Sequence, residues 1–284
     1  MEVIKSQCIL NEQINCLMKD EKKINLVPTM GALHKGHLSL VEKAGSLSDI
    51  VVVSIFVNPT QFNNKLDFQR YPRNFEKDIN FLKNSPCNII FSPSVEEVYP
   101  VPDSRIFDFG MLDKVMEGKY RPKHFNGVAQ VVSRLFEIVK PHKAFFGEKD
   151  FQQLAIIRNM VMQCNYNIEI VGCPIVREKD GLAMSSRNML LDKKMRKKVP
   201  IIAEVLMKSI NFAKSNNPTQ TRNFVIENID NVRELRVEYF EIADGYSLQP
   251  IENWNDTNFI IGCIAVFAGD IRLIDNVFYK YKIT

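Results

Sequence analysis

Short apolar runs alternate with segments of helical periodicity over the first 175 residues, and this alternation strongly constrains the fold. Five of the runs are typical of strands buried on both faces of a parallel sheet. They are INLVPT (24–29), DIVVVSIFV (49–57), NIIFSP (88–93), KAFFG (143–147) and IEIVGCPIV (168–176). Across 128–139, apolar residues at i, i+3, i+4 and i+7 give a helix one apolar face. The alternation predicts a doubly wound parallel α/β sheet, which binds ligands beyond the carboxyl ends of its strands.

The pattern changes after about residue 190, where two helical segments precede three runs of alternating apolar and polar residues. The helical segments are 193–215 and 219–230, and the runs are 235–244, 259–269 and 271–279. We interpret the runs as antiparallel strands with turns at Asp244-Gly245 and Gly269-Asp270. Two domains are therefore expected, a Rossmann-like domain over 1–176 and a smaller α+β domain over 177–284.

Charge, cysteine spacing and hydropathy exclude several classes of protein. The 37 basic and 33 acidic side chains leave a net charge of +4, which is too small and too evenly spread to indicate a nucleic-acid binder by itself, although it leaves an anionic small molecule open as a partner. Six cysteines form no C-x-x-C pair and no metal-ligand spacing, so reduced thiols and a cytoplasmic location are expected. The amino terminus has no apolar signal region, and no apolar run approaches the roughly 20 residues of a membrane span. Neither a nucleic-acid nor a membrane partner is therefore expected.

The loop after the first predicted strand, VPTMGALHKGH (27–37), holds two of the four histidines. His34 and His37 are three residues apart and would face the same way across the first turn of a helix. Free backbone N–H groups and the helix dipole would make this helix start an anion site, and Gly31 and Gly36 would let a phosphate approach the backbone. Two imidazoles could then donate hydrogen bonds to phosphoryl oxygens. The alternative is a helix cap with one half-buried histidine.

A second loop, GEKDFQQ (147–153), places a glycine and three charges between a predicted strand and a helix. Lys149 suits a phosphate, whereas Asp150 suits either a ribose hydroxyl or the helix N-cap. Gln152 and Gln153 lie in the first turns of the helix that follows. This loop is a candidate nucleotide site.

Two other loops carry polar groups that suit a ligand. FVNPTQF (56–62) holds Asn58 and Gln61, whose amides can bond a carboxylate or hydroxyl, although Asn-Pro is also an ordinary turn signal. REKDGLAMSSRN (177–188) combines hydroxyls with the guanidinium of Arg187. It is either a polar linker or a mobile clamp for a triphosphate.

The order of five segments resembles a known family. TMGALHKGH resembles the H-x-G-H signature of the nucleotidylyltransferase superfamily, and MSSRN stands where that superfamily has its second phosphate loop. Together the segments resemble the pantothenate synthetase family over essentially the whole chain. They are LVPTMGALHKGH, VVVSIFVNPTQF, RPKHFNGV, FGEKDFQQLAIIRNMV and VREKDGLAMSSRN.

This resemblance implies a ligation in two steps. The carboxylate of (R)-pantoate attacks the α-phosphorus of Mg²⁺-ATP to give pantoyl adenylate and pyrophosphate, and the amine of β-alanine then displaces AMP to give pantothenate. Because the enzyme supplies no nucleophile, catalysis would depend on positioning and charge stabilisation. The resemblance also implies a homodimer whose smaller domain closes over the ATP site, and it assigns no side chain as a metal ligand.

The resemblance also implies roles for individual residues. The residues implied to bind ATP are Met30, Gly31, Ala32, Leu33, His34, Lys35, Gly36, His37, Gly147, Glu148, Lys149, Asp150, Val176, Met184, Ser185, Ser186 and Arg187. His34 and His37 would be the catalytic pair at the phosphates, with His37 as the acid. The amides of Gln61 and Gln153 would hold pantoate, and Gln61 would also border β-alanine. Asn58 and Arg121 are further candidates for binding substrate.

One segment, RPKHFNGV, departs from the family pattern R-P-G-H-F-x-G-V because Lys123 replaces its glycine. A lysine would be strained if this position needs a backbone angle that only glycine adopts easily. The roles of Arg121 and His124 depend on how the chain accommodates this change.

Two other functions remain open. An adenylyltransferase of the same superfamily would leave AMP on its product and release only pyrophosphate. A nucleotide-binding regulator would need the phosphate loops but would have no reason to keep Gln61 and Gln153 at one pocket.

Overall fold

The computed structural model describes residues 1–62, 68, 69 and 71–281, and these residues form two compact units. The first unit is formed by Met1–Phe109, Arg121–Glu148 and Gln153–Pro174. The second is formed by Gly110–Tyr120, Lys149–Gln152 and Ile175–Thr284. Each unit is described separately below. Among the described residues, every helix falls short of the length and apolar character that a membrane-spanning helix needs.

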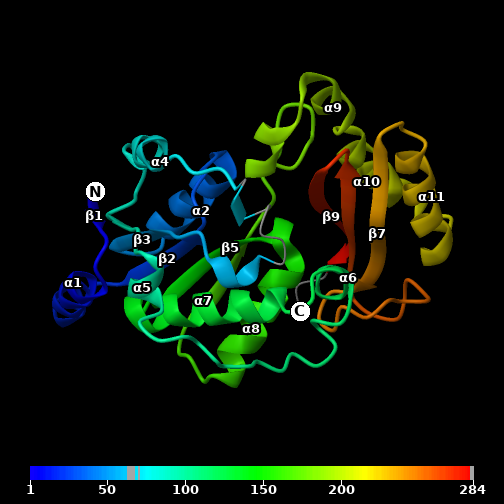
Figure 1. Cartoon of the computed structure of the whole chain (residues 1–284). Coiled ribbons are helices and arrows are strands. Elements are labelled where there is room, and N and C mark those ends of the chain that lie inside the picture. The colour runs from blue at the N-terminus through cyan, green and yellow to red at the C-terminus, as the bar shows by residue number, and fades with distance from the viewer. Residues whose placement is uncertain (63–67, 70, 282–284) are drawn as a thin grey trace. The chain divides into compact units, whose positions relative to one another are not determined.

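The first unit is built on a six-stranded sheet in the order β1-β4-β3-β2-β5-β6 (Figure 1). Its strands are β1 (Glu2–Ile4), β2 (Ile24–Thr29), β3 (Ile50–Ile55), β4 (Ile89–Phe91), β5 (Lys143–Gly147) and β6 (Glu169–Cys173). All neighbouring strands are parallel, and Leu26 in the central strand β2 pairs with Val52 on one side and Ala144 on the other. The prediction of a doubly wound parallel sheet is confirmed.

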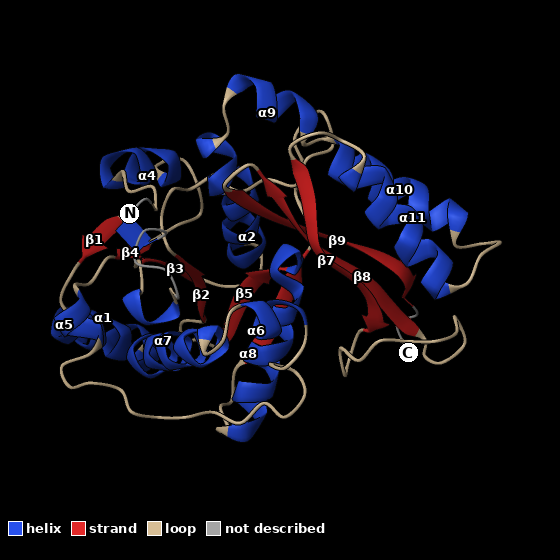
Figure 2. Cartoon of the chain, turned by 45° about the vertical axis from the view of Figure 1, so that its right-hand side comes forward, coloured by secondary structure: helices blue, strands red, loops and turns tan. Residues whose placement is uncertain are grey.

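Helices cover both faces of this sheet (Figures 1 and 2). Helices α2 (Lys35–Gly45) and α4 (Phe75–Leu82) lie on one face. The other face carries α1 (Gln7–Lys19), α5 (Val95–Val98), α7 (His124–Val139) and α8 (Phe151–Gln163). Under α2, the apolar side chains Val27, Val53 and Phe145 from three strands pack with Leu40 and Leu82. Because the strands are buried on both faces, they contain long runs of Val, Ile and Phe.

The edge strand β1 was not predicted from the sequence. It has only three residues, and Glu2 and Val3 are exposed. Its register with β4 pairs Val3 with Ile90. A strand of this length carries too little periodicity to be recognised without its neighbour.

The second unit contains a three-stranded antiparallel sheet in the order β7-β8-β9. The strands are β7 (Leu235–Asp244), β8 (Phe259–Ala268) and β9 (Ile271–Tyr281), as the alternating runs predict. Gly269, with φ +59°, makes the predicted hairpin turn between β8 and β9. Asp244 begins the other predicted turn, but residues 245–258 separate β7 from β8.

Helices pack against this sheet and complete a second apolar core. They include α10 (Ile201–Phe212) and α11 (Pro218–Asp230), and the unit also contains α6 (Met116–Tyr120) and α9 (Lys193–Lys198). Phe240, Ile260 and Ile264 from the sheet meet Leu206 and Val225 from the helices. The prediction of a single helix over 193–215 is wrong, because the structure has two helices there that are separated at Pro200. Proline lacks the N–H that would continue the helical hydrogen bonds.

Lys123 occupies the N-cap of α7 in the left-handed conformation, with φ +67°. This is the position where the related pattern has glycine. A side chain with a Cβ costs about 1 kcal/mol in this region, whereas glycine adopts it readily. We expect Lys123→Gly to raise the free energy of unfolding by about 0.5–1 kcal/mol. Urea denaturation measures this change, and a lower free energy of unfolding would contradict the assignment of strain to Lys123.

Candidate active site

The loop between β2 and α2 turns through two consecutive left-handed residues, Gly31 with φ +78° and Ala32 with φ +50°. A Cβ at Gly31 would lie 2.9 Å from Asp78 Oδ2 and 3.2 Å from Ile55 Cγ2. Glycine is therefore required here by its backbone angle and by the space that Asp78 occupies. The turn starts from Thr29, whose hydroxyl accepts a hydrogen bond from the Gly31 N–H at 3.2 Å.

The two predicted histidines lie side by side at the start of α2. Their ring centroids are 4.1 Å apart. His34 is the N-cap, and its Nδ1 accepts a hydrogen bond from the Gly36 N–H at 3.1 Å. The His34 N–H in turn donates to Nδ1 of His37 at 3.3 Å, which completes a capping box. Because a backbone N–H can only donate, each neutral imidazole carries its proton on Nε2.

The prediction that free N–H groups form the anion site is wrong for five positions of this loop. The Ala32 and Leu33 N–H groups donate to Asp78 Oδ2 at 2.9 Å and to Asp78 Oδ1 at 2.8 Å. The N–H groups of Gly31, His34 and Gly36 are taken by the side chains described above. These five backbone N–H groups are therefore hydrogen-bonded within the protein. Asp78 was not predicted, because an acidic residue in the first turn of a helix is common on stability grounds alone.

Asp78 is buried, with only 3% of the residue exposed. Burial raises the pKa of this carboxyl, and the hydrogen bonds from Leu33 and Ala32 oppose the rise. These two bonds, and the neighbouring Lys77 cation, favour the charged form of the carboxyl.

Gln61 lies against the histidine loop. It ends the short helix η1 (Pro59–Gln61) after β3, is 8% exposed, and donates from Nε2 to the sulfur of Met30. Its backbone carbonyl accepts a hydrogen bond from Nδ1 of His124 at 2.8 Å. The structure thus brings together two loops that are about 30 residues apart in the sequence.

Asn58, 1% exposed, uses its amide inside the protein. Its Nδ2 donates to the Gly127 carbonyl at 3.1 Å and lies 3.4 Å from Gln61 Oε1, and its Oδ1 accepts from the hydroxyls of Thr60 and Tyr99. These bonds fix Gln61 against α7. A direct contact between Asn58 and substrate stays a prediction.

The loop after β5 forms the short helix η2 (Glu148–Asp150) and leads into α8. Gln152 is 4% exposed, and its Nε2 donates to the carbonyls of Leu112 at 2.7 Å and Val115 at 2.9 Å. Its Oε1 accepts from the Glu117 N–H at 2.9 Å. Gln152 is therefore occupied in holding residues 112–117, and the neighbouring Gln153, which is half-buried, remains the candidate for a ligand.

In the second unit, the predicted phosphate loop follows a small hairpin closed by the Arg177–Ala183 bridge. Ser185 is the N-cap of η3 (Ser186–Leu190), and its hydroxyl accepts a hydrogen bond from the Arg187 N–H at 3.3 Å. Val176, which precedes the hairpin, accepts a hydrogen bond from the Met184 N–H at 3.0 Å. Val176 and Met184 are therefore adjacent in the structure.

Two neighbouring side chains of β9 fasten this region of the second unit. Asp275 binds the guanidinium of Arg177 through both oxygens, at 2.6 Å and 3.0 Å. The adjacent Asn276 donates from Nδ2 to the Lys149 carbonyl at 3.1 Å. Two of the predicted nucleotide segments are thus attached to consecutive positions of one strand.

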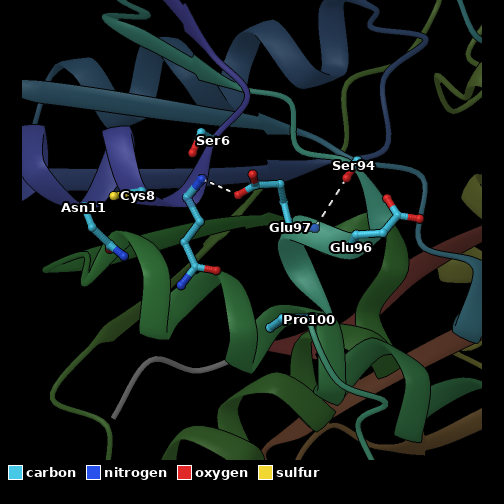
Figure 3. A pocket seen from close by; sticks show the side chains of 8 residues that line it. Ser6, Cys8, Asn11, Ser94, Glu96, Glu97 and Pro100 are labelled. Atoms are coloured by element: carbon cyan, nitrogen blue, oxygen red, sulfur yellow. Dashed lines mark hydrogen bonds between the residues drawn. The ribbon is translucent and has the colours of Figure 1, made fainter.

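An open pocket of about 560 Å³ lies elsewhere in the first unit, at the start of α1 (Figure 3). Its lining residues are Ser6, Gln7, Cys8, Asn11, Ser94, Glu96, Glu97 and Pro100. The Gln7 N–H already donates to Glu97 at 2.6 Å, and two carboxylates would repel a phosphate. None of the predicted site residues lines it. Within the described part of the chain, no three His, Cys, Asp or Glu side chains gather as a metal site would require.

Comparisons with known proteins agree over nearly the whole chain. The profile of the family described as Pantoate-beta-alanine ligase matches residues 2–278. The chain is 54% identical to a pantothenate synthetase of Bacteroides fragilis over 280 residues, which are 99% of each protein. A pantothenate synthetase of Porphyromonas gingivalis is 51% identical over 99% of this chain and 100% of its own.

Solved structures give the same result. The pantothenate synthetase of Thermus thermophilus superposes with a TM-score of 0.93 at 38% identity, covering 99% of this chain and 100% of its own. A pantoate-beta-alanine ligase of Francisella tularensis, complexed with β,γ-ATP and β-alanine, has a TM-score of 0.82 at 36% identity, covering 98% of each chain.

Proposed function

The chain belongs to the pantoate-beta-alanine ligase family, and we propose how its residues carry out the reaction of that family. The enzyme joins (R)-pantoate to β-alanine and cleaves ATP to AMP and pyrophosphate. In the first step a pantoate carboxylate oxygen bonds to the α-phosphorus and pyrophosphate leaves. In the second step the β-alanine amine bonds to the acyl carbon, loses a proton, and AMP leaves. The observation that carries the proposal is the imidazole pair at the start of α2, on a loop whose Met30 contacts Gln61.

His34 and His37 bind the phosphates of ATP through Nε2. Their Nδ1 atoms accept hydrogen bonds from backbone N–H groups, so the donor on each neutral ring is Nε2–H. Negative charge grows on the departing pyrophosphate as the P–O bond breaks. Donors fixed in advance stabilise that charge without having to reorganise.

Gln61 and Gln153 hold pantoate between two side-chain amides, and Gln61 also borders β-alanine. The Gln61 amide donates to the thioether of Met30, which is a weak acceptor. A carboxylate or hydroxyl can replace that partner at little cost. Asn58 keeps Gln61 in place, and Arg121 is a further candidate for the substrate carboxylate.

The remaining candidates contact the nucleotide. We assign Gly147 to Asp150 to the ribose and phosphates, Val176 to the adenine and Met184 to Arg187 to the triphosphate. Mg²⁺ would enter with ATP and neutralise phosphate charge, since Mg²⁺ is commonly held by substrate phosphates and only one or two carboxylates. The homodimer, the cytoplasmic location and the division at residue 176 are proposals that rest on the sequence.

The test of this function is AMP release from Mg²⁺-ATP and pantoate, with and without β-alanine, together with exchange of labelled pyrophosphate into ATP. We expect pantoate-dependent exchange without β-alanine and AMP release only when β-alanine is added. Pyrophosphate release without AMP would instead identify an adenylyltransferase that keeps AMP on its product. ATP binding without any turnover would identify a regulator.

Gln153→Ala is expected to raise the KM for pantoate about tenfold and to leave the KM for ATP nearly unchanged, because one amide that orients pantoate is lost. Steady-state kinetics with each substrate varied measures the difference. The adjacent Gln152→Ala is the matched control, since both ends of the Gln152 amide are hydrogen-bonded to the backbone of residues 112–117. It should lower the Tm without raising the KM for pantoate. Equal KM values for Gln153→Ala and the unmodified enzyme would remove Gln153 from the pantoate site.

A further inference from the structure

We propose that Asp78 is a positioning residue for the reaction, which sets the conformation of the ATP-binding loop by clamping two consecutive backbone N–H groups. The inference rests on the proposed function, because it takes the loop between β2 and α2 as the ATP site. Asp78 belongs to a different element, α4, and lies 45 residues from the nearer of the two amides along the chain.

The carboxylate contacts are specific to the loop. Each oxygen accepts one N–H, Oδ2 from Ala32 at 2.9 Å and Oδ1 from Leu33 at 2.8 Å. Hydrogen bonds to an ionised acceptor are about twice as strong as bonds between neutral groups. Leu33 directly precedes His34, the N-cap of α2, so the clamp ends one residue before the imidazole pair.

The clamped backbone is one that the chain would not adopt freely. Ala32 has φ +50°, a conformation that costs a residue with a Cβ about 1 kcal/mol, and Gly31 before it has φ +78°. The carboxylate fills the space where a side chain at Gly31 would lie. The turn therefore accommodates the carboxylate of Asp78. It also determines where the backbone places His34 and His37.

Helix α4 does not need this carboxylate for its own stability. Asn74 already caps the helix by accepting a hydrogen bond from the Lys77 N–H at 3.0 Å, and Leu82 packs in the core. A buried carboxylate is costly unless it is hydrogen-bonded, so an apolar residue would serve packing better. The groups that face Asp78 are the two loop amides, with Lys77 as the neighbouring cation that favours its charged form.

The test compares Asp78→Asn with Asp103→Asn. Both substitutions turn a buried carboxylate of the first unit into an amide of the same size, and Asp103 bonds Arg105 and Arg134 rather than the loop. The asparagine side chain has only one acceptor oxygen. One of the two loop N–H groups therefore loses its acceptor and faces the NH₂ donor of the amide. For this variant we expect about a tenfold rise in the KM for ATP, and a smaller increase in Tm on adding Mg²⁺-ATP than the unmodified protein gives. The KM for pantoate should change less than about twofold.

Asp103→Asn should lower the Tm in the absence of ligand and leave both KM values unchanged. Similar KM values for ATP in the two variants would overturn the positioning role, since a rise in KM would then reflect lower stability alone. If Asp78→Asn does not fold, Asp78→Glu is assayed in the same way. Its longer side chain keeps the charge but displaces the loop, and an unaltered KM for ATP would overturn the proposal. An unmodified protein that binds ATP but forms no pantothenate would refute the proposed function, while the ATP-dependent Tm shift would still test Asp78.

Discussion

Replacing His37 by alanine is expected to lower kcat about 10²- to 10³-fold while changing the affinity for ATP by no more than about threefold. Removal of one fixed hydrogen-bond donor to the charge that develops in the transition state lowers kcat by about this factor. The His37 Nε2–H contact is proposed to strengthen as pyrophosphate departs, so its loss affects the transition state more than bound ATP. Steady-state kinetics gives kcat, and ATP binding to the free enzyme is measured by titration calorimetry. Equal losses in kcat and in ATP affinity would contradict this role.

The control for this variant is His37→Gln, because His37 also stabilises the start of α2. Its Nδ1 accepts the His34 N–H in a capping box, and alanine removes that bond. Glutamine is a usual residue at this position of a capping box, so it restores the cap without the imidazole. We expect His37→Gln to recover the Tm of the unmodified enzyme and to keep kcat low. Recovery of kcat together with the Tm would show that the helix cap accounts for the effect of His37→Ala.

Most of the fold could be predicted because the buried strands have a strong local signal. Strands β2 and β5 begin and end where the apolar runs do. The edge strand β1 could not be predicted, since three residues gain their structure from pairing with β4 rather than from their own pattern. Pro200 is itself a signal for a break between helices. The apolar periodicity on both sides of it nevertheless favours one continuous helix.

The hydrogen bonds of the candidate site could not be predicted from the sequence. The spacing of His34 and His37 correctly predicts neighbouring rings. It does not reveal that the two Nδ1 atoms and Asp78 would occupy the loop amides, because those bonds depend on the turn at Gly31 and on a helix far along the chain. In the same way, only the contacts of Gln152 show that it holds residues 112–117, whereas Gln152 and Gln153 look alike in the sequence.

The second unit provides the largest expected change in stability, from Asp275→Ala. Asp275 is 4% exposed, and its carboxylate is the bidentate partner of Arg177, which also donates to the Gly181 carbonyl at 3.1 Å. Breaking a buried ion pair leaves a poorly solvated charge, and we expect the free energy of unfolding to fall by about 3 kcal/mol. Urea denaturation measures this loss. The expected consequence is weaker ATP binding, because Arg177 begins the hairpin that carries Met184 to Arg187.

Arg196→Ala is the matched control for this prediction. Arg196 pairs with Glu178 and Asp180, which belong to the same hairpin, but these two carboxylates are 31% and 40% exposed. Exposed pairs contribute about 1 kcal/mol or less, so Arg196→Ala should have a small effect on unfolding. Comparable losses for the two variants would mean that the Arg177–Asp275 pair is no more than another surface contact. A large loss for Asp275→Ala alone would establish that burial of this pair, rather than the number of charges on the hairpin, holds the predicted phosphate loop to β9.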